Sequence, residues 1–328
     1  MEKVYVIHIS VDGLTPHIIR ELGEQKLPGF YKIRKNGVFT DHARTDFHFT
    51  KTLPNHTAMF TSIPMIDLVS FNEDNGKKIH DLQNRYIYSL YDILKDSGLD
   101  ANMYVGKNKF KFIKNSYPEC RMGLYTNADF KTLSDRGCIY YKNGIPINSK
   151  NNIQTLPIID RLLTDNKDNK LARYNFVHFR GTDSMGHMYG WDSKEYKHAV
   201  RAVDHDLMKL LNMIDNDNKN IKLLLTSDHG GGVGKDGAIT DHSDANHYIN
   251  FTIPFYAYQK GRQSYDGARD LYKINPSRQR PFVYYNPDYS EIAQPIRNGD
   301  IGNLVLSLLK LPCIKDSVIN KNQDLKIE

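Results

Sequence analysis

Carboxylate and imidazole side chains gather in three short motifs of this sequence. The motif "SVDG" contributes Asp12, "GTDSMGH" contributes Asp183 and His187, and "TSDHGGG" contributes Asp228 and His229. The four-residue spacing in the second motif lets both side chains converge on one ion in a turn or first helical turn. In the third motif the glycines allow the sharp bend that would bring both adjacent side chains to an ion. Carboxylates and imidazoles without a thiolate suit catalytic Zn²⁺, with Mn²⁺ as its competitor.

These motifs hold more ligands than one ion needs. A catalytic zinc ion takes three protein ligands, whereas the motifs offer five, and His242 or His247 could add another. Two ions about 4 Å apart could share such a set, an arrangement that serves displacement at phosphorus by holding the attacking and leaving oxygens. Taken singly, an aspartate after a strand is usually a turn or a helix cap. The two-metal prediction therefore depends on the joint pattern of all three motifs.

Each motif directly follows an apolar run that predicts a buried strand. These runs cover residues 4–11, 174–179 and 221–225. Apolar residues at helical spacing predict helices over 85–97 and 194–214. Strands that alternate with helices favour an α/β fold with a mainly parallel sheet. Because ligands of such folds bind beyond the carboxyl ends of the strands, we expect the active site where the three motifs meet.

Length and composition indicate one large globular domain. The chain has 328 residues, of which 40% are hydrophobic and 25% charged, a composition typical of proteins with a sizeable core. Within a single domain over 1–328, two stretches of poor periodicity, about 106–155 and 259–290, predict insertions that serve as lids or caps. The C-terminal "IGNLVLSLLKLP" predicts a packing helix that ends at Pro312.

Other sequence features narrow the class of partner. No apolar run approaches the ~18 residues needed to cross a bilayer, and three scattered cysteines do not make a disulfide scaffold. The net charge of +6 mildly favours anionic ligands. It is spread along the chain without a basic block or a nucleic-acid motif, and the expected partner is a small-molecule substrate. A strand-like run near Met1 leaves no visible signal peptide. We expect a soluble protein, secreted or periplasmic if a leader has been removed and otherwise cytoplasmic, of open oligomeric state.

The stretch "FTKTLPNHTAMFTS", residues 49–62, places polar side chains just ahead of an apolar run. Considered alone, it predicts the start of a helix with Asn55 as a cap. Beside a pair of metal ions, however, the hydroxyl of Thr52 becomes a candidate nucleophile. Coordination to a metal lowers the pKa of a bound oxygen by many units, so that a threonine needs no protein base.

These motifs, together with a histidine before "IPF", come in an order and spacing that resemble the alkaline phosphatase superfamily. The closest resemblance is to its nucleotide pyrophosphatase/phosphodiesterase branch, and it covers the core strands and the C-terminal helix but neither insertion. It implies an alkaline-phosphatase-like fold, with a mainly parallel central sheet flanked by helices and cap insertions. It also implies hydrolysis of phosphodiester or phosphoanhydride bonds of nucleotide-like substrates through a phospho-threonine intermediate at two divalent ions.

The resemblance assigns a role to each candidate residue. It implies Thr52 as nucleophile and Asn55 as a side-chain donor to the phosphoryl oxygen. Of the two later histidines, His242 fits better than His247, because a small residue and a short variable stretch separate it from the "IPF" strand. One ion would be held by Asp12, Thr52, Asp228 and His229, and the other by Asp183, His187 and His242.

The nine histidines without such a context are expected to be surface or packing residues. His178 lies inside a predicted strand, and His56 either orients the nucleophile loop or has a structural role. The nine are His8, His17, His42, His48, His56, His80, His178, His198 and His205.

The sequence also departs from the family pattern. Nucleotide-cleaving members carry Pro-x-x-His-Gly after the nucleophile helix, whereas this chain has "SIPMIDLVSFNED", which leaves the esterified group open. Monoesterases need an additional cation near the nucleophile, and the sequence offers only Lys51 and the more distant Arg44. A diesterase is therefore favoured, with a phosphomonoesterase or phosphonate hydrolase as the alternative. "TLPNH" lacks the Cys/Ser-x-Pro-x-Arg pattern of sulfatases, and a non-catalytic metal-binding protein is the alternative from another class.

Overall fold

The structure of the protein is a computed structural model. This structure describes residues 2–65, 81, 83, 85–107, 109–110, 121–124, 141–142, 145–146, 156–261 and 269–328.

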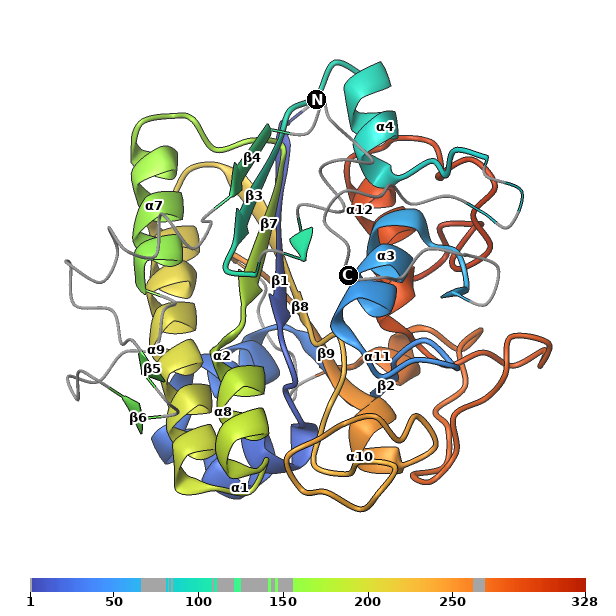
Figure 1. Cartoon of the computed structure of the whole chain (residues 1–328). Coiled ribbons are helices and arrows are strands. Elements are labelled where there is room, and N and C mark those ends of the chain that lie inside the picture. The colour runs from blue at the N-terminus through green and yellow to red at the C-terminus, as the bar shows by residue number, and fades with distance from the viewer. Residues whose placement is uncertain are drawn as a thin grey trace.

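An eight-stranded sheet runs through the centre of the protein (Figure 1). The strand order is β10-β2-β9-β8-β1-β7-β3-β4, and only β9 runs antiparallel to its neighbours. This confirms the expected α/β class with a mainly parallel sheet. The strands, in chain order, are β1 (Val4–Val11), β2 (Val38–Arg44), β3 (Ala101–Val105), β4 (Arg121–Leu124), β7 (Tyr174–Phe179), β8 (Asn220–Thr226), β9 (Thr252–Gln259) and β10 (Arg269–Asp270), with a separate pair β5 (Tyr141–Lys142) and β6 (Ile145–Pro146).

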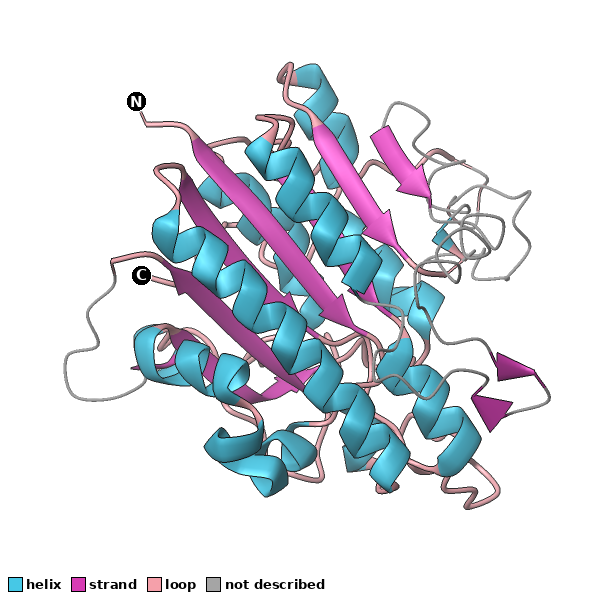
Figure 2. Cartoon of the chain, turned by 90° about the vertical axis from the view of Figure 1, so that its left-hand side faces the viewer, coloured by secondary structure: helices cyan, strands magenta, loops and turns pink. Residues whose placement is uncertain are grey.

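Helices cover both faces of the sheet. One layer packs over the face seen in Figure 2, and it contains α1 (Pro16–Lys26), α2 (Pro28–Asn36), α7 (Leu156–Lys167), α8 (Gly181–Tyr189) and α9 (Lys194–Asn216). The opposite layer contains α3 (Thr52–Thr61), α4 (Leu90–Asp96), α10 (Tyr248–Phe251), α11 (Leu271–Ile274), the 3₁₀ turn η2 (Asn298–Asp300) and α12 (Ile301–Leu308).

Alternate side chains of β1 contribute to the apolar cores on the two faces of the sheet. Ile7, Ile9 and Val11 belong to the apolar core beneath α9, whereas Val6 belongs to the core beneath α3. Because successive side chains point to opposite faces, the residues of β1 that share a face with Val6 look toward α3. That register also sends Asp12, one residue past the strand, toward the α3 side of the sheet.

The expected strands 4–11 and 174–179 coincide with β1 and β7, and β8 exceeds the expected 221–225 by one residue at each end. The helix expected over 85–97 is shorter, because α4 begins only after Ser89. Ser89 Oγ accepts a hydrogen bond from the Tyr91 amide, and the Asp92 carboxylate accepts one from the Ser89 amide. This capping box fixes the start of the helix.

Both stretches expected to be cap insertions contribute strands to the main sheet. Most of 106–155 lies outside the described residues, but within it β4 pairs with β3 at the sheet edge. Within 259–290, β10 pairs with β2 at the other edge. These parts of the two stretches therefore lie in the main sheet, and the role of the stretches as lids or caps stays a prediction.

Arg44 anchors the loop that follows α11. Its guanidinium is fully buried and donates to the carbonyl oxygens of Phe282, at 2.9 Å, and Tyr285, at 3.0 Å. The side chain is thereby committed to this loop, so Arg44 is not the cation near the nucleophile that the sequence left open.

Candidate metal centre

The first cluster of candidate ligands forms where β1 and β8 end. Asp12 follows β1 directly, and Asp228 and His229 follow β8 by two and three residues. The Nε2 atom of His229 lies 3.4 Å from Asp12 Oδ1 and 3.4 Å from Asp228 Oδ2. All three side chains are completely buried. The structure thus brings together three of the residues that the sequence assigned to one ion.

The second cluster forms around the start of α8. Asp183 lies in the first turn of this helix and His187 one turn later, and His187 Nε2 is 3.4 Å from Asp183 Oδ1. His242 Nε2 lies 3.6 Å from the same oxygen and 3.1 Å from His187 Nε2. Its ring stacks on that of His229 with centroids 3.8 Å apart. The two clusters are therefore adjacent.

Of the two later histidines, the structure places His242 in this cluster and His247 at the start of α10 (Tyr248–Phe251). His242 lies in the loop after β8, where its Nδ1 is 2.5 Å from the carbonyl oxygen of Thr50. This contact turns Nε2 toward Asp183. His247 instead caps α10, where its Nδ1 accepts a hydrogen bond from the Ile249 amide at 3.4 Å.

Several candidate ligand atoms in the two clusters have no hydrogen-bond partner among the described residues. Asp12 Oδ1, Asp183 Oδ1, Asp228 Oδ2 and His229 Nε2 are buried and make no hydrogen bond with any described residue. Burying a charged oxygen without a partner is costly. Oxygen and imidazole nitrogen atoms that converge in this way fit divalent cations such as Zn²⁺, so the residues present suit the group that the sequence predicts.

Burial and neighbouring charges perturb the titration of these groups. Burial, reinforced by the negative charge of Asp12, raises the pKa of Asp228 to about 7. Burial lowers the pKa of His242 to about 3, which leaves its imidazole neutral at physiological pH. Burial alone would lower the pKa of His229, but the neighbouring carboxylates outweigh it and raise this pKa. A neutral imidazole beside ionisable carboxylates is the state that binds a metal.

Thr52 is the first residue of α3 and lies beside both clusters. The preceding residue, Lys51, has extended backbone angles and forms the N-cap, so Thr52 and Leu53 belong to the first helical turn. That turn lines a cavity of about 480 Å³ together with Asp183 and His242. The N-terminus of a helix favours anions because its amide groups point outward and carry partial positive charge. The nucleophile candidate therefore lies where a phosphoryl group would be bound.

The contacts of Asn55 differ from the contact to a phosphoryl oxygen that the resemblance implies. Its side chain is completely buried, and its Nδ2 donates to the carbonyl oxygens of Phe49, at 2.8 Å, and Lys51, at 3.0 Å. Its Oδ1 accepts from the Asp46 amide and from Asn298 Nδ2, both at 2.9 Å. Both amide hydrogens are thus used in holding the loop before α3, and neither is left for a phosphoryl oxygen.

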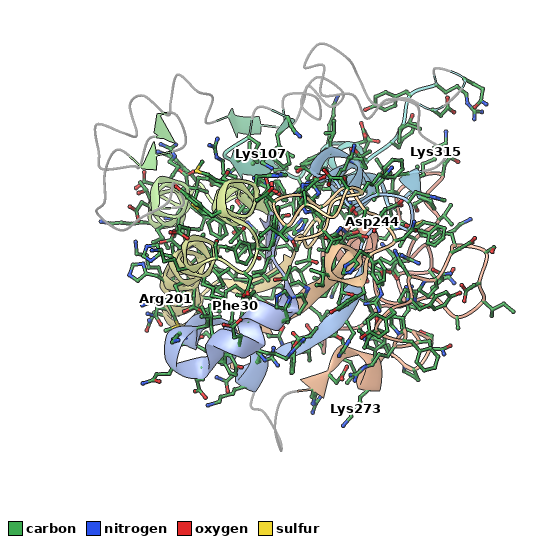
Figure 3. All side chains as sticks on the ribbon, turned by 60° about the horizontal axis from the view of Figure 1, so that its bottom comes forward. Phe30, Lys107, Arg201, Asp244, Lys273 and Lys315 are labelled. Atoms are coloured by element: carbon green, nitrogen blue, oxygen red, sulfur yellow. The ribbon has the colours of Figure 1, made fainter. Side chains whose placement is uncertain are left out.

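Lys107 is a site residue that the sequence reasoning missed. It follows β3 by two residues (Figure 3), and its Nζ lies 2.5 Å from Asp12 Oδ2, 2.8 Å from Asp183 Oδ2 and 3.2 Å from Thr52 Oγ1. Burial alone would lower the pKa of its ammonium group, but the carboxylates raise it, so the side chain stays charged. Its position just past a strand end is the signal that could have found it.

A layer of buried histidines lies behind the clusters on the α3 side of the sheet. His178 Nε2 is 2.9 Å from Asp12 Oδ2. His56 Nε2 is 2.8 Å from Ser10 Oγ, and its Nδ1 is 2.7 Å from the carbonyl oxygen of Thr52. Both were expected to be packing or structural residues, and both are buried. They also contact a candidate ligand or the nucleophile residue itself, so they help to position the site.

Trp191 holds the three motif loops against one another. Its Nε1 donates to the carbonyl oxygen of Gly13 at 2.8 Å. A Cβ atom on Gly186 or on Gly231 would collide with its ring. Glycine at these two positions lets helix α8 and the loop after β8 pack against the same indole. The motif glycines are therefore required for close packing as well as for chain reversal.

The sequence matches the family described as type I phosphodiesterase / nucleotide pyrophosphatase, over residues 6–64 and 67–306. The chain belongs to this family. The resemblance noted from the motifs is thereby confirmed, and with it the class of metal-dependent, phosphoryl-transferring enzymes. A comparison with curated proteins found no match.

Similar solved structures share the fold at low sequence identity. One is the integral membrane protein lipooligosaccharide phosphoethanolamine transferase A from Neisseria meningitidis, with a TM-score of 0.61 and 13% identity. The match covers 99% of this chain and 57% of that enzyme, or 92% of its soluble domain. The lipoteichoic acid synthase from Listeria monocytogenes has a TM-score of 0.62 and 12% identity, over 99% of this chain and 76% of that one.

A protein in the alkaline phosphatase superfamily from Vibrio parahaemolyticus is also similar, with a TM-score of 0.58 and 13% identity, over 94% of this chain and 67% of that one. The expected alkaline-phosphatase-like fold is thus confirmed. Among the described helices, none is both long and apolar enough to cross a membrane.

Proposed function

We propose that this protein is a hydrolase that cleaves phosphodiester or phosphoanhydride bonds of nucleotide-like or related substrates through a phospho-threonine intermediate on Thr52. The observation that carries the proposal is the position of this hydroxyl. It lies at the start of a helix, lines the same cavity as Asp183 and His242, and is 3.2 Å from an ammonium group that also contacts Asp12. Family membership supports phosphoryl transfer as the reaction class.

The chain offers two sets of metal ligands to this reaction. Asp12, Thr52, Asp228 and His229 would hold one divalent ion, and Asp183, His187 and His242 the other. We expect Zn²⁺ in both sites, with Mn²⁺ as the alternative. When bound, such ions stabilise the attacking and leaving oxygens of an in-line displacement.

The chemical roles of the protein's own groups follow from their positions. Thr52 Oγ gives up its proton to water and attacks phosphorus, so that an Oγ–P bond forms while the bond from phosphorus to the leaving oxygen breaks. The leaving group departs as an alcohol or nucleotide after its oxygen takes up a proton from water. Water then attacks the phospho-threonine, the Oγ–P bond breaks, and the hydroxyl of Thr52 regains a proton. The first turn of α3 orients the phosphoryl group throughout.

A phosphomonoesterase or phosphonate hydrolase is the second candidate, and Lys107 favours it. The sequence argument for a diesterase relied on the lack of a cation near the nucleophile. Lys107 supplies such a cation, and Lys51 and Lys109 line the same cavity. This observation weakens that argument while leaving the chemistry at Thr52 unchanged.

The test compares two threonines of the same helix. Thr57 is buried in α3 and its hydroxyl donates to the Leu53 carbonyl oxygen at 2.9 Å, away from the ligand clusters. We expect Zn²⁺-loaded wild type and Thr57→Ala to hydrolyse bis-p-nitrophenyl phosphate or a p-nitrophenyl nucleotide diester, and Thr52→Ala to fold but lose this activity. Hydrolysis by Thr52→Ala at the wild-type rate would refute the mechanism.

Metal dependence is measured on the same proteins. Chelation should abolish turnover and Zn²⁺ should restore it. A wild-type protein that binds Zn²⁺ tightly but turns over neither diesters nor monoesters would instead support a non-catalytic metal-binding role.

A further inference from the structure

The loop between α11 and η2 presents a cluster of apolar side chains to solvent. Of the eight large apolar or aromatic side chains that are exposed among the described residues, five lie in this loop, and they are Phe282, Val283, Tyr284, Tyr285 and Ile292. We call residues 282–292 the aromatic loop. The residues that line the cavity at Thr52 belong to other parts of the chain. Single exposed apolar residues are common on protein surfaces, but a cluster of them indicates contact with another molecule.

Two buried arginines fix the backbone of the aromatic loop. Arg44 donates to the carbonyl oxygens of Phe282 and Tyr285, and Arg297 donates to that of Pro287. Both arginine side chains are almost completely buried, and burying a charged group is costly unless hydrogen bonds compensate it. These contacts hold the exposed side chains in a defined position, because they tie the backbone between them to the core of the protein.

The same hydrogen bonds suit the aromatic loop to an apolar medium. A backbone group that enters lipid must find its hydrogen-bond partner within the protein, because no water is left to supply one. The carbonyl oxygens of Phe282, Tyr285 and Pro287 already have such partners in the two guanidinium groups. The Tyr285 amide donates to the Phe282 carbonyl oxygen at 3.1 Å. Pro281 and Pro287 have no amide hydrogen to satisfy.

The size and shape of the cluster favour a bilayer over a second protein molecule. A stable protein interface takes about 20–30 residues a side, whereas this cluster has five apolar side chains on one loop. Phe282 is 82% exposed and Tyr284 is 76% exposed, so both stand almost clear of their neighbours. Tyrosine is typical of membrane interfaces, because its ring is apolar and its hydroxyl can stay among the headgroups. In Figure 1 the chain between α11 and α12 reaches outward on the right-hand side of the molecule, where it could meet a flat surface.

The charges in and beside the aromatic loop favour no anionic surface. Arg280, two residues before the loop, is paired with Asp270. Asp288 and Glu291 within the loop are acidic, and Glu291 accepts a hydrogen bond from the Tyr285 hydroxyl. Insertion of apolar side chains is therefore the expected source of binding, and a zwitterionic bilayer suffices for it.

We propose that the aromatic loop is a membrane-docking element that inserts Phe282, Tyr284 and Ile292 into the interface of a zwitterionic phospholipid bilayer. The inference goes beyond the proposed function and does not depend on it, because it concerns a surface outside the cavity at Thr52. Since only a few side chains insert, the docking is weak and reversible.

The test measures co-sedimentation with phosphatidylcholine vesicles, at an ionic strength high enough to screen the net charge of +6. We expect wild type to bind, and the double variant Phe282→Ser/Tyr284→Ser to bind about 10- to 100-fold more weakly, because each ring loses the apolar burial that the bilayer provides. The matched control is Val318→Ser, which removes an exposed apolar side chain outside the loop and should bind like wild type. Wild type that stays in solution at millimolar lipid, or a double variant that binds equally well, would overturn the proposal.

A fluorescent variant reports insertion directly and keeps the aromatic loop apolar. In Phe282→Trp, the emission of the new indole should move to shorter wavelength when vesicles are added, over the constant signal of buried Trp191, the only tryptophan of the chain. Emission that is unchanged by vesicles would contradict insertion. Sedimentation velocity without lipid tests the other occupant: a dimer that the double variant abolishes, in a wild type that binds no vesicles, would assign the loop to self-association and overturn the proposal.

Discussion

The metal-free protein should become more stable when one of its candidate ligands is neutralised. Asp228→Asn is the sharpest test, because the replacement has the same shape. The Oδ1 atom of Asp228 accepts hydrogen bonds from the amides of Gly13, at 3.1 Å, and His229, at 3.0 Å, and an asparagine Oδ1 can keep both. The Oδ2 atom has no hydrogen-bond partner among the described residues. The substitution therefore removes a buried charge and few contacts.

The size of the effect follows from the pKa of Asp228. Burial and the charge of Asp12 raise it from 3.8 to about 7. A group with a raised folded-state pKa holds its proton more tightly in the folded than in the unfolded protein, so the stability it contributes is present below pH 3.8 and is lost as pH rises through about 7. At pH 8 the ionised carboxylate costs about 4 kcal/mol of folding free energy, and at pH 5 about half of that.

Urea unfolding of chelator-treated protein, followed by circular dichroism, measures the difference. We expect Asp228→Asn to exceed wild type by about 4 kcal/mol at pH 8 and by about half of that at pH 5. Zn²⁺ should then stabilise wild type more than the variant, which keeps only the Asp183, His187 and His242 set intact and should also be inactive. If metal-free Asp228→Asn were no more stable than wild type at pH 8, the argument from buried, unpaired charge would be wrong.

Asp46 provides the matched control. It is also buried, but its Oδ1 accepts from the His48 amide at 3.0 Å, and its Oδ2 accepts from the Met65 amide at 3.0 Å and from the Tyr289 hydroxyl at 2.8 Å. In Asp46→Asn, the NH₂ group of the new side chain would face hydrogen-bond donors that the carboxylate now accepts from. We expect it to lose about 1–3 kcal/mol of stability.

Three further predictions test the surroundings of the site. His178→Ala should weaken Zn²⁺ binding about 10- to 100-fold in a competition titration, because partners of a ligating carboxylate tune metal affinity; the exposed His205→Ala should not. Gly231→Ala should lower the melting temperature, at a cost of about 1–3 kcal/mol, because its Cβ would collide with Trp191, and an unchanged melting temperature would contradict that packing. Burial lowers the pKa of His8 from 6.5 to about 3, so the contribution of this side chain to wild-type stability should fall as pH drops below 6.5, by about 2 kcal/mol at pH 5. On going from pH 7 to pH 5, the urea midpoint of His8→Gln should therefore shift upward relative to that of wild type.

Most candidate ligands at the carboxyl ends of the strands could be predicted, because the sequence patterns that indicate them are local. One buried strand ends just before Asp12 and another ends two residues before Asp228. To recognise either from sequence, one needs only an apolar run followed by polar residues and glycine. The four-residue spacing of Asp183 and His187 likewise survives as one turn of α8. Such features depend on neighbouring positions in the chain, and the sequence shows these directly.

The features that were missed depend on contacts across long stretches of chain. Lys107 and Thr52 are 55 residues apart and His178 and Asp12 166 residues apart, and no local pattern marks either pair. Asn55 has the right place in its motif, yet Asn298, 243 residues further on, helps to hold its side chain away from the cavity.

The sequence by itself determined the class of fold, the family and the order of the metal-binding motifs, because strand periodicity and motif spacing are written along the chain. Only the tertiary structure decided what each polar side chain contacts. The register between β1, β7 and β8 sets which buried oxygens face one another, and whether such an oxygen has a partner depends on side chains brought there by other elements. The position of Lys107 beside Thr52 and that of His242 beside Asp183 both follow from that packing.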